Sequence, residues 1–158
     1  MRDARMVPGC VQRPRVPFAG AATGPRGMRL AAEYGRAWVT HGDRARPGGT
    51  AGPDVLPLLG RQLDGVRRAC AEAGRDLAGL DRMVLGSRLV PRLTGSADRL
   101  LDFAAECAAL GFTDLVLHRP RPSGVFSGDV AAFEEVVRTA LPHIRRLRPA
   151  EPAGTDGR

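Results

Sequence analysis

Four short apolar runs alternate with helical hydrophobic patterns along the chain. The runs cover residues 16–22, 37–39, 83–85 and 115–117. Short apolar runs bounded by turn residues are typical of buried strands, and their alternation with amphipathic helices is typical of a parallel α/β fold. The pattern therefore predicts the element order βαβαβαβα.

The first of these units, residues 16–40, carries the most distinctive turn. The apolar run stops at Thr23-Gly24-Pro25-Arg26-Gly27, and a helix is predicted to follow it. We expect this helix to turn one face inward and to end at Gly35. The residues of that predicted face are Met28, Leu30, Ala31 and Tyr34.

The start of this helix is a candidate phosphate site. Pro25 suits the first helical position, and the amides of the next residues point out of the helix start with the positive end of the helix dipole behind them. Such a terminus accepts an anion. An ordinary strand-to-helix turn, whose glycines serve only geometry, explains the same spacing, and short glycine motifs do not separate the two interpretations.

Three further helices are predicted from apolar spacing and from their start and stop residues. They cover residues 54–74, 96–111 and 129–144, and each begins at an Asp or Ser. Pro142 predicts a kink or an interruption in the last of them. Residues 41–52 are dense in Gly, Arg and Pro and predict a mobile loop.

Composition narrows the chemistry. The chain has 158 residues, a length typical of one domain, and its apolar content of 43% is enough for a core. All 24 basic residues are arginine, so neither a Schiff-base lysine nor a P-loop lysine can occur. The net charge is +7, but the arginines are scattered without interleaved aromatics, and we expect no nucleic-acid partner.

The cysteines and the termini point to a reduced, non-membrane setting. Cys10, Cys70 and Cys107 have no metal-ligand spacing, so we expect no metal site. Residues 1–15 carry no signal-peptide pattern, no run could span a membrane, and we expect a cytoplasmic location. We predict disorder for residues 1–15 and 148–158, and one domain over residues 16–147.

Two folds accommodate this alternation, a small doubly wound sheet and part of a (β/α)8 barrel. A complete barrel needs about 250 residues, so this chain can hold roughly half of one. An open piece of barrel has two unpaired sheet edges and an uncovered apolar face, which we expect at Phe18, Trp38 and Leu117. We therefore expect either self-association or a missing N-terminal half.

Three segments together resemble the second half of the luciferase-like monooxygenase family. They are residues 18–38, which contain Ala-Ala-Thr-Gly-Pro-Arg-Gly; residues 67–76, which end in Gly-Arg-Asp; and residues 103–120, which end in Leu-Val-Leu-His-Arg-Pro. The likeness is closest to the coenzyme F-420-dependent oxidoreductases of that family. It implies an α/β fold that is a partial TIM (β/α)8 barrel, made of about the last four βα units.

The resemblance also implies a function. The intact activity would be hydride transfer between F-420 and a small organic substrate. Residues of the first turn would contact the cofactor's phosphate. FMN, in a monooxygenase of the same family, stays an alternative cofactor. A non-catalytic half-barrel that binds a phosphate compound or a partner chain is the third interpretation, because the family's first four βα units are absent. The implied phosphate-contact residues are Ala22, Thr23, Gly24, Arg26 and Gly27.

Polar residues follow the other strands at the same predicted rim. His118 is the candidate acid or base, since histidine is the usual acid–base residue of sites that work near neutral pH, although a hydrogen bond to a loop carbonyl would also explain it. Arg119 and Thr40 are candidate contacts for a substrate or an anion. Ser87 and His41 also fall at the ends of strands.

Overall fold

A four-stranded parallel sheet forms the centre of the fold. The computed structural model describes residues 11–13, 15–42, 54–90, 92–124 and 126–151. Within them the sheet has the order β1-β2-β3-β4, and every neighbouring pair is parallel. The strands are β1 (Ala19–Ala21), β2 (Ala37–Thr40), β3 (Asp81–Leu85) and β4 (Asp114–Val116). The predicted parallel alternation of strands and helices is confirmed.

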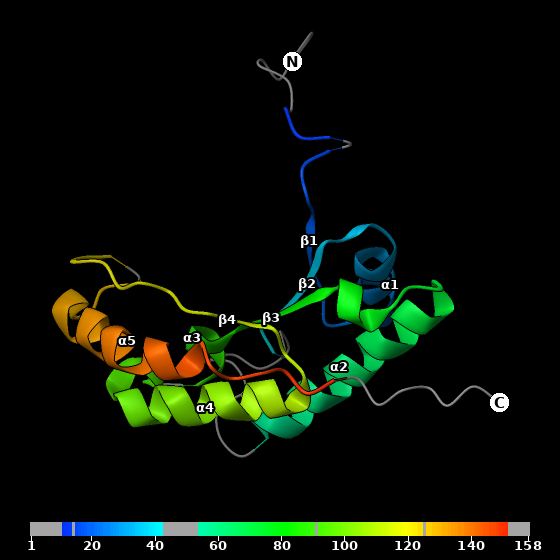
Figure 1. Cartoon of the computed structure of the whole chain (residues 1–158). Coiled ribbons are helices and arrows are strands. Elements are labelled where there is room, and N and C mark those ends of the chain that lie inside the picture. Colours follow the sequence, from blue (N-terminus) through cyan, green and yellow to red (C-terminus); the bar gives the residue numbers. More distant parts are fainter. Residues whose placement is uncertain (1–10, 14, 43–53, 91, 125, 152–158) are drawn as a thin grey trace, which may run out of the picture.

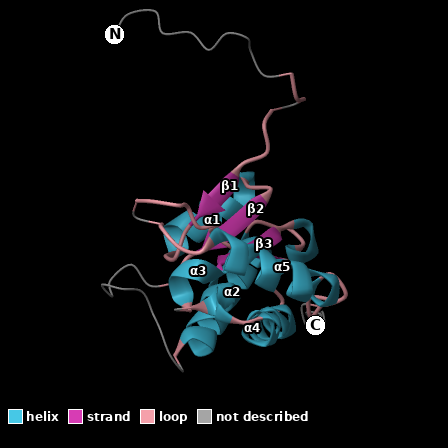
Figure 2. Cartoon of the chain, turned by 90° about the vertical axis from the view of Figure 1, so that its left-hand side faces the viewer, coloured by secondary structure: helices cyan, strands magenta, loops and turns pink. Residues whose placement is uncertain are grey.

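Each pair of consecutive strands is joined through a helix, and a further helix follows the last strand (Figure 1). The long helices are α1 (Pro25–Tyr34), α2 (Val55–Glu72), α4 (Ala97–Leu110) and α5 (Val130–Ile144). A short helix, α3 (Gly86–Leu89), and two 3-10 turns, η1 (Leu77–Gly79) and η2 (Leu93–Gly95), complete the connections. Figure 2 shows the helices gathered on one side of the strands.

The helices begin and end where their capping residues predict. The hydroxyl of Ser96 accepts a hydrogen bond from the amide of Arg99 at the start of α4, and Asp129 caps α5 in the same way. Gly111 ends α4 in the left-handed conformation, at φ 107°. Pro142 lies inside α5, which continues through it as far as Ile144. Most of the predicted loop 41–52 and parts of both predicted disordered termini lie outside the described residues.

The core lies between the sheet and the helices, and Trp38 is its largest member. Trp38 is fully buried, and its ring stacks on Phe112 at a centroid distance of 5.9 Å. On the neighbouring strand β3, Val84 is also fully buried. The prediction of Trp38 on an uncovered face is therefore wrong. Because residues 37–39 are apolar on both sides of the strand, the run itself does not indicate which side faces the helices.

The opposite face of the sheet carries apolar side chains, and the described residues place no helix layer over it (Figure 1). These side chains are exposed or partly exposed: Ala19, Ala21, Val39, Met83, Leu85 and Val116. Parallel sheets are normally covered on both faces. The sheet thus has one buried face and one that the described residues leave open.

Two predictions of burial near the N-terminus are wrong. Residues 16–22 form a strand only at Ala19–Ala21, and Val16 is 48% exposed. Phe18, which we expect to be uncovered, is 54% exposed. In α1, Met28 and Ala31 are buried as predicted, but Leu30 and Tyr34 are exposed. The reason for both errors is the same: β1 and α1 lie at the end of the sheet and of the helix layer, and the described residues form no further strand or helix beside them.

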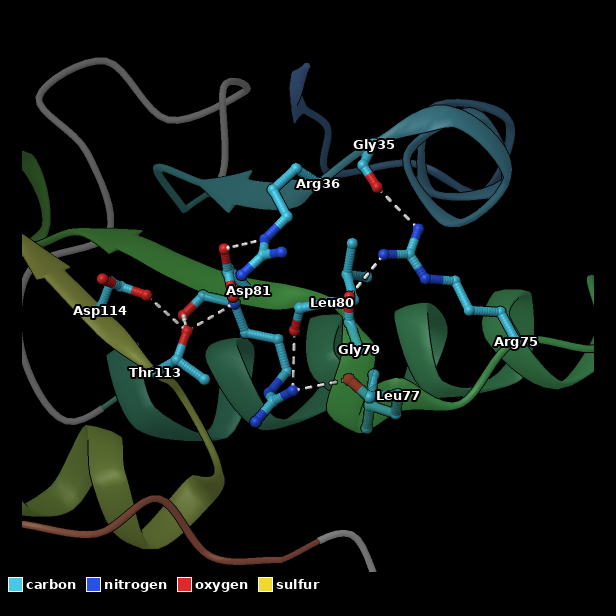
Figure 3. A network of polar contacts seen from close by, with 10 residues as sticks. Gly35, Arg36, Arg75, Leu77, Gly79, Leu80, Asp81, Thr113 and Asp114 are labelled. Carbon is cyan, nitrogen blue, oxygen red and sulfur yellow. Dashed lines mark hydrogen bonds and ion pairs between the residues drawn. The ribbon is translucent and has the colours of Figure 1, made fainter. Parts of the chain in front are cut away.

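Arginines fix the end of the sheet where the strands begin (Figure 3). Arg82 is 5% exposed and donates hydrogen bonds to the carbonyl oxygens of Gly111, Leu77 and Leu80 at 2.6, 2.7 and 2.8 Å. Burial lowers the pKa of this guanidinium. Nearby, Arg75 donates to three further carbonyl oxygens, those of Ala32, Gly35 and Gly79. These contacts stabilise the fold at the amino ends of the strands. In α/β folds a functional site is expected at the carboxyl ends of the strands.

Candidate functional site

The loop at residues 22–27 connects the carboxyl end of β1 to α1 and is held in place by β2. The amide of Ala22 donates to the carbonyl oxygen of Val39 at 3.0 Å. The indole Nε1 of Trp38 donates to the carbonyl oxygen of Ala22 at 2.8 Å. Both backbone groups of Ala22 are therefore fixed before the loop turns into the helix.

The start of α1 is open. Gly24 is the N-cap residue in an extended conformation, and no side chain caps the helix. The first helical hydrogen bond runs from the amide of Met28 to the carbonyl oxygen of Gly24, at 3.1 Å. The amides of Arg26 and Gly27 precede that bond, at a helix end whose donors need partners from outside the helix. Gly24, Pro25 and Arg26 are exposed, so an anion can reach these amides.

The two glycines of the loop differ in what the fold requires of them. A Cβ on Gly27 would lie 2.7 Å from the Cβ of Ala22, so packing excludes a side chain there. A Cβ on Gly24 would meet no atom within 4 Å, and its φ of −115° suits any residue. Packing in the turn therefore explains why residue 27 is a glycine. Neither packing nor backbone conformation explains the glycine at position 24. A bare backbone at Gly24 keeps space open above the helix start.

A basic groove between α1 and α2 begins beside this loop. It has a volume of about 410 Å³ and is lined at one end by Thr23 and along its length by Arg29, Arg61 and Arg68. Glu72 is the acidic side chain that lines it. The guanidinium groups add positive potential next to the helix start, which favours an anionic ligand.

Thr40 lies behind the rim rather than on it. It is fully buried, and its hydroxyl donates to Gln62 Oε1 at 2.5 Å and accepts from the amide of Gly42 at 3.2 Å. The side-chain amide of Gln62 in turn donates to the carbonyl oxygen of Gly42 at 3.3 Å. Thr40 thus supports the chain that leaves β2, with no surface left for a ligand. His41, which follows it, is partly exposed.

His118 lines a second pocket, at the carboxyl ends of β3 and β4. Its backbone amide donates to Ser87 Oγ at 2.9 Å, and its exposed ring stacks on Phe126 at 5.1 Å between centroids. The pocket has a volume of about 360 Å³ and also contains Arg92 and Asp129. The structure therefore brings Ser87 and His118 together, as the strand ends predict.

Arg92 is a pocket residue that sequence reasoning missed. It adopts the left-handed conformation at φ 54°, which a residue with a side chain rarely does. Asp129 was predicted only as a helix cap; its carboxylate caps α5 from the wall of the same pocket. The sequence does not indicate that either residue lines a pocket, because the segment around Arg92 has no periodic pattern of apolar positions that would predict its structure.

Arg119 faces a different part of the molecule from its neighbour His118. Its guanidinium forms an ion pair with Glu134 at 2.6 Å, and both side chains are exposed. It lines a groove along α5 and not the pocket of His118. As an anion contact Arg119 would have to leave this carboxylate, a change that costs little for an exposed pair.

The glycine loop and the histidine pocket lie at opposite ends of one rim. They follow β1 and β4, which are three strand steps apart, or about 14 Å at the usual spacing of parallel strands. One chain therefore presents two separate candidate regions, one with an open helix start and one with the imidazole of His118.

The buried cysteines take no part in this site. Desolvation raises the pKa of Cys70, and it raises that of Cys107 to about 12. Both thiols are therefore protonated near neutral pH and are poor nucleophiles. Among the described residues, no group of three or more His, Cys, Asp or Glu side chains could hold a metal ion. No helix in the described part of the chain is long and apolar enough to cross a membrane.

A scan against models of protein families found no match to the chain, and a search of curated proteins found none either.

Proposed function

We propose that this chain is the C-terminal portion of a luciferase-like, coenzyme F-420-dependent oxidoreductase, folded as about four units of a TIM (β/α)8 barrel. The parallel order of β1 to β4, with the helices on one face, is the arrangement that consecutive units of such a barrel require. The resemblance of residues 18–38, 67–76 and 103–120 to that family supplies the identity of the activity.

The observation that carries the proposal is the open helix start at Gly24. The chain has a glycine there that neither packing nor backbone conformation requires, in front of two amides without a helical partner. In nucleotide-binding α/β folds a glycine at such a turn allows phosphate to approach the backbone. Ala22, Thr23, Gly24, Arg26 and Gly27 would hold the cofactor's phosphate in this way.

The protein's own residues would position the ligand and shape its surroundings. The amides of Arg26 and Gly27 would orient the phosphate, while Trp38 holds the loop through Ala22. The arginines of the α1–α2 groove would add attraction for further negative charge on the ligand. The cofactor itself supplies the hydride chemistry. His118 is placed to donate or accept a proton at the far end of the rim.

A binding experiment tests the phosphate assignment. F-420, FMN and riboflavin, which lacks the phosphate, are titrated into the purified chain, with fluorescence or heat as the signal. We expect F-420 to bind more tightly than FMN, and riboflavin to bind at least ten times more weakly than FMN. Tighter binding of FMN would favour the monooxygenase alternative. Equal affinities for FMN and riboflavin would contradict a phosphate site.

Two valine variants locate the site. Gly24→Val places a side chain in the open space before the helix and should weaken FMN and F-420 binding at least tenfold. Gly79→Val is the matched control, because a Cβ on Gly79 also meets no atom within 4 Å but lies at the opposite end of the sheet. Equal effects of the two substitutions would contradict binding at the glycine loop.

A non-catalytic half-barrel is the second candidate function. The exposed apolar side chains on one face of the sheet favour it, since an enzyme's barrel interior is normally closed. Binding of a phosphate compound without turnover in the presence of F-420 would support this candidate over the first.

A further inference from the structure

The two ends of the molecule each lack a neighbour. Within the described residues, β1 pairs only with β2 and β4 pairs only with β3, so each edge strand has one free side. The helix layer ends in the same way, with α1 at one end and α5 at the other (Figure 1). An unpaired edge next to an exposed helix side is a surface for another βα unit.

The α5 end carries an apolar groove bordered by arginines. The groove has a volume of about 510 Å³, with Val137, Leu141 and Pro142 among its apolar residues and Arg138 and Arg145 beside them. Ala140 is the one buried residue of α5, although the helix contains several large apolar side chains. Glu134 also lines the groove, so the free side of α5 is apolar and, with three arginines, basic overall.

The α1 end carries apolar side chains without a groove. Leu30 and Tyr34 are 53% and 57% exposed, and they lie four residues apart, on one side of the helix. On the covered side of α1, Met28 reaches Gly65 of α2 so closely that a Cβ on Gly65 would lie 2.8 Å from the sulfur. Leu30 and Tyr34 thus form a ridge on the side of α1 that no helix of the described residues covers.

We propose that the partner for both ends is a second copy of this chain. A rotation of 180° about an axis parallel to the strands places β4 of one copy beside β1 of the other, and α5 beside α1. The twofold symmetry forms the same contact a second time, between the other two ends of the copies. All eight strands stay parallel, and the ridge of each copy meets the groove of the other. A twofold dimer of this kind leaves no free edge.

Charges on the two helices agree with this pairing. Asp129, at the start of α5, lines the rim pocket with His118. Like α1, α5 therefore begins at the carboxyl ends of the strands. Arg138 is the ninth residue of α5 and Glu33 is the ninth residue of α1. Both lie about 12 Å along their helices and carry opposite charges. Arg138 now pairs with Glu135 on its own exposed helix turn, and a surface pair of this kind exchanges partners at little cost.

The dimer would also bring the two halves of the rim together. Within one copy, the glycine loop follows β1 and His118 follows β4, so the two are separated by three strand-to-strand spacings. In the dimer, β4 of one copy lies directly beside β1 of the other. That separation is one strand step, or about 5 Å between strand axes. The second copy therefore supplies the histidine pocket that a ligand on the glycine loop would meet.

Sedimentation equilibrium of the full chain measures the assembly. We expect a dimer at micromolar concentration. Leu30→Arg and Leu141→Arg should each raise the dimer dissociation constant at least tenfold. Ala109→Arg is the control, because Ala109 is exposed on α4, between the two ends of the layer, and it should leave the constant unchanged. A monomeric wild-type chain, or an equal effect of all three substitutions, would overturn the proposal.

A charge exchange tests the orientation of the two copies. Glu33→Arg and Arg138→Glu should each weaken the dimer by about threefold to tenfold, and the double variant should regain most of the loss. Far-UV circular dichroism checks that each variant is folded. Glu33→Cys with Arg138→Cys, in a Cys10→Ser background, should give a covalent dimer on oxidation. A folded dimer that neither regains affinity nor cross-links would exclude this pairing.

Discussion

The indole Nε1 of Trp38 donates a hydrogen bond to the carbonyl oxygen of Ala22 across 2.8 Å. Trp38 is a fully buried residue of the sheet, whereas Ala22 begins the loop in front of α1. The contact joins the buried core to the proposed phosphate site. The indole of Trp38 and the carbonyl oxygen of Val39 thus hold the two backbone groups of Ala22 at the start of the loop.

Replacing Trp38 by Phe should affect both stability and binding. The variant loses part of a buried ring and leaves the Ala22 carbonyl without its donor, which together should cost about 2–4 kcal/mol of unfolding free energy. Urea unfolding measures this cost. The control Phe112→Leu removes the stacked partner of Trp38 but leaves the hydrogen bond in place. We expect only Trp38→Phe to weaken FMN binding among folded molecules, and an equal loss in both variants would contradict the role of the bond.

The two loop glycines should respond oppositely to alanine. Gly27→Ala forces a methyl group to within 2.7 Å of Ala22 and should lower the unfolding free energy by about 1–3 kcal/mol. Gly24→Ala adds a methyl group in open space, restricts the unfolded chain, and should leave stability unchanged or raise it by up to about 1 kcal/mol. Thermal and urea unfolding of both variants checks this. A large destabilisation by Gly24→Ala would show that the fold itself requires this glycine.

Arg82 should be essential for stability rather than for binding. Its replacement by Met keeps the aliphatic stem but removes the donors for the carbonyl oxygens of Leu77, Leu80 and Gly111, which should cost about 2–5 kcal/mol. Arg36→Met is the control at the same end of the sheet, because its guanidinium is exposed and its ion pair with Asp81 should contribute little to stability. Similar unfolding curves for the two variants would contradict this assignment.

The buried thiol of Cys107 should make the fold sensitive to alkali. Its pKa is raised from 9.0 to about 12, so the folded state retains a proton that the unfolded state has lost between these values. Stability should therefore be complete below pH 9 and fall by up to about 1.4 kcal/mol per pH unit above it. Urea unfolding of the wild type and of Cys107→Ala from pH 8 to 11 isolates this contribution. Parallel pH profiles would show that the thiol does not cause it.

The sequence predicted the order of elements well because local signals specify it. Asp129 and Ser96 cap helices, Gly111 ends one, and apolar runs mark three of the four strands closely. Which side of each strand is buried was harder to predict. The residues before and after Trp38 in the sequence are also apolar, so only tertiary packing determines that Trp38 faces the helices.

The candidate site was predictable only in part. The glycine loop and the pairing of Ser87 with His118 follow from the rule that parallel strands end at one edge. The burial of Thr40 depends on Gln62, which is twenty-two residues away in the sequence. The ion pair of Arg119 with Glu134 likewise depends on how α5 packs. Contacts of this kind have no local signal, because each is made by a side chain on a separate element.

The most direct test of the phosphate site observes the amides of Arg26 and Gly27. Nitrogen–proton correlation spectra of the labelled chain are recorded during titration with FMN and, separately, with riboflavin. We predict that FMN shifts the amide resonances of Arg26 and Gly27 more than any others in α1, and that riboflavin does not shift them. Saturating FMN binding that leaves both resonances unmoved would contradict the central claim.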